Sequence, residues 1–70
     1  MIDVVNDVRN AYIQGIEHAD NADTVSKLYR HYRIFTRSLT MGGCIDEISR
    51  KLLNHDMSEL RKERIKQLND

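Results

Sequence analysis

Proline and tryptophan are absent from this 70-residue chain, and only three glycines and one cysteine occur. Proline interrupts helices, so its absence favours helix throughout. Cys44 has no second cysteine with which to form a disulfide within the chain. These absences exclude a disulfide-stabilised secreted domain and fit a reducing, intracellular setting.

An excess of charge is also absent, because eleven basic residues balance eleven acidic ones. Dedicated nucleic-acid binders usually carry excess positive charge, since they gain affinity by releasing counterions from phosphates. No apolar run approaches the roughly 20 residues that span a bilayer. The opening "MIDVVNDVRN" lacks the apolar region of a secretory signal. We therefore expect a cytoplasmic protein with neither a membrane nor a nucleic-acid partner.

Helical periodicity is what the first half of the chain does contain. Apolar residues recur at alternating steps of three and four, which places them on one stripe of a helix, as in a coiled-coil seam. The first seam consists of Val5, Val8, Tyr12, Gly15 and Ala19, and the second of Val25, Leu28, Tyr32, Phe35 and Leu39. "HADNADT" separates the two predicted helices, with a helix cap expected at Asn21 or Asp23.

Two of the three glycines stand side by side in "TRSLTMGGCIDE". Glycine adopts positive φ at little steric cost, so Gly42 or Gly43 is expected to end the second helix and redirect the chain. Alternatively, the pair lets the backbone approach another subunit or a ligand closely. Gly15 lies within a helix, where glycine costs about 0.5–1 kcal/mol relative to alanine, and close helix–helix contact would offset that cost.

The C-terminal third predicts shorter helices. A third apolar stripe consists of Ile45, Ile48 and Leu52, and Arg50 lies near the end of that predicted helix. "NHD" at 54–56 predicts another break, after which Asp56 and Glu59 form a loose capping box. The predicted fold is all-α: one domain over 1–70, made of a helical hairpin plus one or two short C-terminal helices.

A chain of this length is expected to be marginal as a monomer, because it buries only about 60% of the surface that its unfolded form exposes. Small domains offset this with disulfides, a metal or self-association. We therefore expect a helical homo-oligomer. Its interface is predicted on the two seams, at Val5, Val8, Gly15, Leu28, Tyr32 and Phe35.

Candidates for catalysis and metal binding are few. His18 and Asp20 are two positions apart, which on a helix points them to different sides, and His55 and Asp56 are adjacent. Neither H-E-x-x-H nor C-x-x-C is present. A thiolate at Cys44 would be favoured at a helix start, but a small buried apolar side chain is the preferred interpretation. We expect no enzyme activity, no metal and no cofactor.

The second predicted helix carries a basic surface. Lys27, Arg30, Arg33 and Arg37 lie roughly opposite the apolar seam, at about 100° per residue, and Tyr29 lies between the two faces. A solvated cationic face is the simplest interpretation. An anion site is the functional alternative, because guanidinium groups bind phosphate bidentately and tyrosine offers a stacking plane. Acidic partner proteins would suit the same surface.

The stretch "RHYRIFTRSLTMGGC" resembles a helical segment of phage anti-CBASS and anti-Thoeris sponges, which sequester cyclic nucleotides. The residues that fit the order of that segment are Arg30, Ile34, Leu39 and Gly42. Gly43 departs from it, since a bulky residue would be expected there. The resemblance implies a small helical oligomer that holds the ligand between subunits. It also implies that Tyr12 stacks on a base while Lys27 and Arg30 neutralise phosphate.

Two hypotheses of function follow. The first is a non-enzymatic, phage-type immune-evasion protein that sequesters a cyclic nucleotide between subunits. The alternative is a small helical interaction module, such as an inhibitor, an antidote or a transcription regulator, that binds a host protein. DNA binding through the 27–37 face would need a dimer that concentrates the positive charge.

Overall fold

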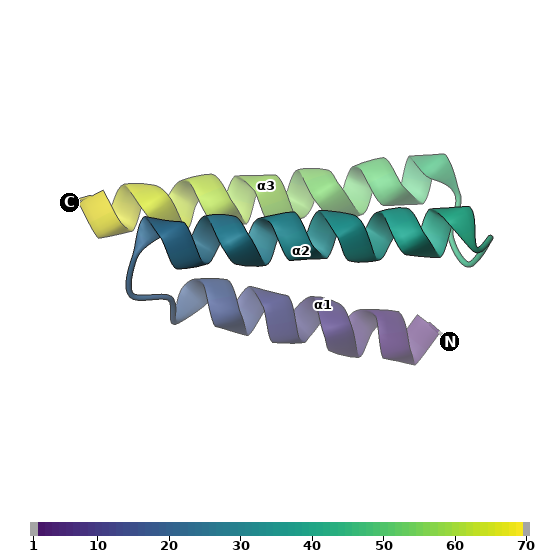
Figure 1. Ribbon diagram of the computed structural model, residues 1–70, viewed down its shortest axis with the longest axis horizontal. Helices are drawn as coiled ribbons and strands as arrows, with labels where there is room; N and C mark the ends of the chain where they lie inside the picture. Colours follow the sequence, from purple (N-terminus) through teal and green to yellow (C-terminus); the bar gives the residue numbers. More distant parts are fainter. Residues whose placement is uncertain (1, 70) are drawn as a thin grey trace.

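Three helices form the protein in a computed structural model that describes the backbone of residues 2–69 and the side chains of residues 4–69. They are α1 (Ile2–Glu17), α2 (Ala22–Met41) and α3 (Glu47–Asn69). Each helix runs opposite to the one before it, in a bundle measuring 40 × 19 × 14 Å (Figure 1). The all-α prediction is confirmed. None of the helices in the described range is long and apolar enough to cross a membrane.

The turn between α1 and α2 is built by Asn21. Its backbone is extended (φ −151°), and its Oδ1 accepts a hydrogen bond from the Thr24 N–H at 2.8 Å. This satisfies one of the free donors at the helix start, as an N-cap requires. Arg64 of α3 donates from Nη2 to the carbonyl oxygen of buried Ala19 at 2.8 Å. The predicted cap is confirmed, and the turn is tied to α3.

The glycine pair ends α2 as predicted. Gly42 is the C-cap, and Gly43 follows with φ +78°. The Cys44 N–H donates to the Leu39 carbonyl at 2.9 Å, and the Gly43 N–H donates to the Thr40 carbonyl at 3.1 Å. These two bonds are the pair that defines a Schellman motif. Only a residue that tolerates positive φ fits at position 43 without strain.

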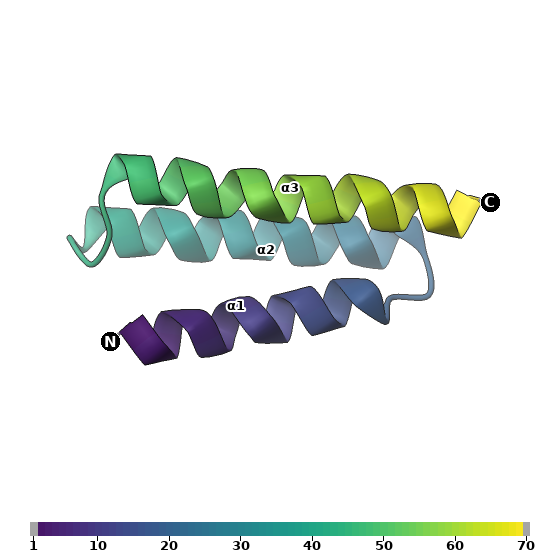
Figure 2. The same cartoon turned by 180° about the vertical axis from the view of Figure 1, so that it is seen from behind.

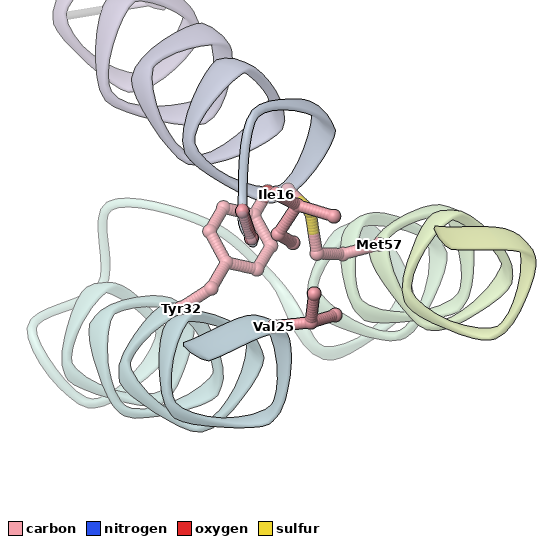
Figure 3. Close-up of a cluster of buried hydrophobic side chains, with 5 residues drawn as sticks. Ile16, Val25, Tyr32 and Met57 are labelled. Carbon is pink, nitrogen blue, oxygen red and sulfur yellow. The ribbon is translucent and has the colours of Figure 1, made fainter. Parts of the chain in front are cut away.

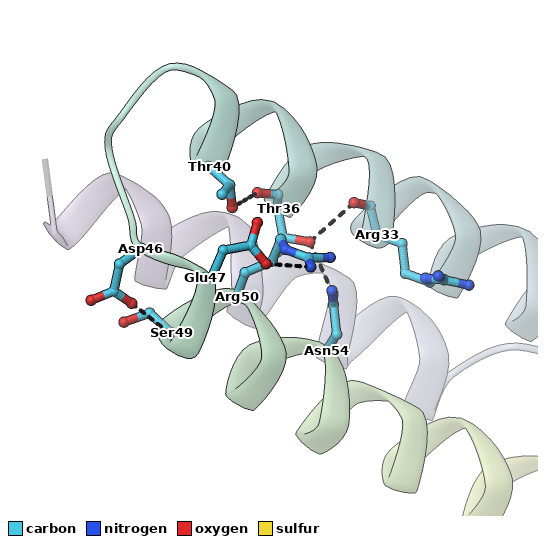
Figure 4. Close-up of polar contacts among 8 residues, drawn as sticks. All are labelled: Arg33, Thr36, Thr40, Asp46, Glu47, Ser49, Arg50 and Asn54. Atoms are coloured by element: carbon cyan, nitrogen blue, oxygen red, sulfur yellow. Dashed lines mark hydrogen bonds and ion pairs between the residues drawn. The ribbon is translucent and has the colours of Figure 1, made fainter.

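The predicted break at 54–56 is wrong, because α3 continues through it as a 23-residue helix. Asn favours turns because its side chain competes for nearby backbone groups. In the fold, the Asn54 Oδ1 instead accepts a hydrogen bond from the Thr36 hydroxyl of α2 at 2.9 Å (Figure 4). Met57 follows in the next turn and is 2% exposed, which anchors α3 to the core. A tertiary hydrogen bond and apolar burial therefore override the local turn signal.

The core draws on all three helices (Figure 3). The buried apolar residues are Ile16, Ala19, Val25, Tyr32 and Met57. The Tyr32 ring also packs edge-on against Tyr12, with ring centroids 5.4 Å apart. The Tyr32 hydroxyl is buried and has no hydrogen-bond partner. This aromatic pair joins α1 to α2 at the middle of the bundle.

Most of the seam residues predicted to meet another subunit are used within the chain. A Cβ on Gly15 would stand 3.1 Å from Leu28 Cδ1, so glycine is what lets α1 and α2 approach closely here. Tyr32 is fully buried by its own chain. Val8 is half-buried, and only Val5 and Phe35 border an open cleft. The close contact expected at Gly15 is therefore intramolecular.

The two ends of the bundle differ. The closed end comprises the 18–21 turn, the adjoining turns of α1 and α2, and the last turns of α3. The open end comprises the start of α1, the end of α2, the 42–46 loop and the start of α3. No described side chain in 4–12 or 37–53 is fully buried. Toward this end, α1 diverges from the other two helices (Figures 1 and 2).

Candidate functional site

Four arginines surround a shallow cleft of about 180 Å³ on the α2–α3 face. Arg30, Arg33 and Arg37 come from α2, and Arg50 comes from α3, while Ile34 supplies an apolar wall. We call this surface the arginine cleft. Steps of three and four residues place the three α2 arginines on neighbouring turns of one helix face.

The register of α3 against α2 brings Arg50 to the arginine cleft. The hydrogen bond between Thr36 and Asn54 fixes that register, and Asn54 lies one helical turn after Arg50 on α3. From the sequence, Arg50 was predicted to lie near the end of a short helix and was not predicted as a site residue. The spacing of three residues between Glu47 and Arg50 indicates locally that the two side chains can pair. The α2 residues beside Arg50 follow only from the tertiary fold.

Positive charge in the arginine cleft is incompletely neutralised. Arg50 Nη2 lies 2.6 Å from Glu47 Oε2, and this contact lowers the pKa of the Glu47 carboxyl. The three α2 arginines form no ion pair with the described carboxylates. Arg50 Nε is buried and also lacks a hydrogen-bond partner. The three α2 arginines therefore offer free guanidinium donors to an anion.

Tyr29 lies beside the arginine cleft and contacts two guanidinium groups. The guanidinium carbon of Arg61 is 4.7 Å from the centre of the ring, and that of Arg33 is 5.9 Å away. Both distances fall within the range of cation–π attraction. The ring thus orients two arginines and extends the basic surface along α3. The ring therefore already contacts two arginines of its own chain, whereas the sequence suggested a tyrosine free to stack on a ligand.

The three residues predicted to bind a ligand do not share one cleft within the chain. Tyr12 lines a separate hollow with Leu28 and His31, on the α1 side of α2. Lys27 is exposed on α2. Arg30 lines the arginine cleft. Tyr12 and Arg30 therefore line different hollows of the chain.

A second cleft, of about 290 Å³, opens at the open end. Its lining residues are Val4, Val5, Asn6, Phe35, Leu39, Cys44 and Ile45. Cys44 is exposed here, so the preferred interpretation of a buried cysteine is wrong. The reason is that the Schellman turn leaves Cys44 in the loop after α2, where it lines the cleft and is exposed. We call this the apolar cleft.

Other reactive side chains do not assemble. His18, His31 and His55 are all exposed. Across residues 2–69, no three His, Cys, Asp or Glu side chains lie close enough together to hold a metal ion. The carboxyl of Asp56 lies 3.9 Å from the Arg9 guanidinium, in a loose surface pair.

No protein-family model, curated protein or solved structure matches this chain. The resemblance to the phage sponges thus stays a prediction from a few residues. The arginine cleft is the feature that bears most directly on it.

Proposed function

We propose that this protein is a non-enzymatic, cytoplasmic binding protein that sequesters a phosphate-bearing ligand, with a cyclic nucleotide as the candidate. The arginine cleft carries the proposal, because four guanidinium groups face it against a single paired carboxylate. Guanidinium donors match phosphate oxygens in bidentate geometry, and such charge-assisted bonds are roughly twice as strong as neutral ones.

The dimensions of the arginine cleft favour a ligand with more than one phosphate. Arg37 lies seven positions after Arg30, which is about 10 Å along a helix axis. The cleft is open, and its volume of about 180 Å³ is below that of an enclosing small-molecule pocket. A dinucleotide would therefore be only partly covered by one chain, and a second copy would complete the enclosure.

A second copy would also give Tyr12 and Lys27 a role. Tyr12 lines a separate hollow, and Lys27 lies one turn before Arg30 on α2 without lining the arginine cleft. In this proposal, both contact a ligand held by a neighbour. Tyr12 would stack on a base and Lys27 would neutralise phosphate. Interception of a defence signal, as in the phage sponges, is the biological role that this chemistry would serve.

Calorimetry with a panel of cyclic di- and trinucleotides tests the proposal. Arg37→Gln removes one cleft guanidinium and should weaken binding by about tenfold or more, as expected for a charged hydrogen bond of about 1.5–3 kcal/mol. Lys66→Gln is the matched control, because it removes one positive charge from an exposed position of α3 outside the cleft. The proposal fails if no ligand binds tighter than millimolar, or if both variants weaken binding equally.

An acidic protein surface is the second candidate partner. The basic surface extends beyond the arginine cleft through Arg33, Tyr29 and Arg61, so it exceeds the footprint of a single phosphate. An inhibitor, an antidote or a transcription regulator would use such a surface. Native mass spectrometry of the protein purified from cells separates the candidates, because it reports a bound protein or a small molecule directly.

A further inference from the structure

The apolar cleft has features that the proposed ligand does not use. Its lining contains no charged residue, and Asn6 is the only residue in it with a polar amide side chain. It lies between the start of α1 and the end of α2, where no described side chain is fully buried. The cleft is therefore part of a core that the single chain leaves incomplete.

Exposed apolar side chains occur at the same end of the bundle as this cleft, and one of them, Val4, lines it. Of the five large apolar residues that are most exposed, four belong to the open end: Val4 at 62%, Met41 at 79%, Ile48 at 72% and Leu52 at 61%. The fifth is Ile34, in the arginine cleft. Single exposed apolar residues are ordinary, but a group confined to one region marks an interaction site.

We propose that the open end is a self-association surface, on which the open end of a second copy of this chain packs about a two-fold axis. A two-fold interface uses the same patch on both copies, so the patch must be complementary to itself. This one offers both a hollow, the apolar cleft, and protrusions such as Val4 and Met41. The protrusions of one copy can enter the hollow of the other.

The surface area supports a second copy as the occupant. The chain exposes 5049 Å², whereas a compact monomer of 8.2 kDa is expected to expose about 4,500 Å². A standard interface buries about 800 Å² on each partner. The excess of exposed surface is comparable with a large part of what one partner buries in such an interface. The exposed apolar residues are concentrated at the open end, where this interface would form.

The charges near the patch agree with pairing between copies. Glu47 and Lys51 are four positions apart on α3, beside Ile48 and Leu52. This border carries both signs, which a two-fold partner can match, whereas a phosphate-rich or strongly acidic partner needs one sign.

Sedimentation equilibrium without nucleotide tests this inference independently of the ligand. We expect a dimer of about twice 8.2 kDa that dissociates on dilution. Val4→Glu and Leu52→Glu introduce charge at exposed positions of the patch and should each raise the dimer dissociation constant at least tenfold. Gln14→Glu introduces the same charge at an exposed position of α1 that lines neither the apolar cleft nor the arginine cleft, and it should leave the constant unchanged.

Circular dichroism of each variant verifies that the helices persist, since all three substituted positions are exposed. A spin label on Cys44 adds a second measurement, because a two-fold contact at the open end gives one narrow distance between labels. That distance should disappear in Leu52→Glu. A strictly monomeric protein at high concentration, or a dimer that is equally sensitive to Gln14→Glu, overturns the proposal.

Discussion

The closed and open ends of the bundle are stabilised by similar local chemistry but by different amounts of packing. Each has a side-chain N-cap, Asn21 at the closed end and Asp46 at the open end. Only the closed end combines its cap with fully buried neighbours such as Ile16 and Val25. Helix formation thus does not require a filled core at both ends, and the open end leaves apolar side chains such as Val4 and Met41 exposed.

Truncating one apolar side chain at each end should give the largest difference in the free energy of unfolding between the two ends. Ile16→Ala removes a fully buried side chain and should lower the free energy of unfolding by about 2–5 kcal/mol. Val4→Ala acts on a side chain that is 62% exposed and should change it by less than about 0.5 kcal/mol. Urea denaturation of dilute protein measures both. Equal losses would show that the two ends are packed alike.

Backbone strain at the open end should have an intermediate effect. Gly43→Ala places a side chain at φ +78° and should destabilise the fold by about 1–2 kcal/mol. Gly42 has φ −81°, and an added Cβ would lie 3.4 Å from the Ser38 carbonyl oxygen, so Gly42→Ala is the control with little expected change. Thermal unfolding distinguishes the pair. Similar losses in both variants would remove positive φ as the reason for glycine here.

Removing the two caps should give the smallest difference in stability between the ends, and this difference should depend on pH. Asn21→Ala should cost about 1 kcal/mol at any pH where the chain is folded. Hydrogen bonds from Ser49 lower the pKa of Asp46, so its stabilisation is present above the ordinary carboxyl pKa and is lost as pH falls through the lowered value. Asp46→Ala should therefore lower the urea midpoint near neutral pH and have little effect in acid. An acid-insensitive loss in Asp46→Ala contradicts this assignment.

Features that depend on neighbours in the sequence could be predicted. The caps at Asn21 and at the glycine pair follow from side chains and torsions that act within a few residues. The helical seams follow from the spacing of apolar residues. The length of α3 could not be predicted, because the partner of Asn54 is Thr36, which lies on another helix.

The candidate site could be predicted only in part. The spacing of the α2 arginines placed them on one helix face, but the contribution of Arg50 required the register between helices. The apolar seams were predicted to be contact surfaces, and parts of them, such as Ala19, Val25 and Tyr32, are buried within the chain. Spacing alone does not say which helix covers a seam, so Gly15, Leu28 and Tyr32 were assigned to a partner although their own chain covers them.

Ionisation of Tyr32 should destabilise the fold in strong base, and it can be followed by absorbance. Burial raises the pKa of its phenol, the nearby Asp56 adds to the shift, and Arg9 opposes it. The stability that this group contributes is fully present below the ordinary tyrosine pKa of about 10 and is lost as pH rises through the raised value. Phenolate absorbance from Tyr32 should therefore appear together with loss of helix in strong base, and Tyr32→Phe should uncouple the two.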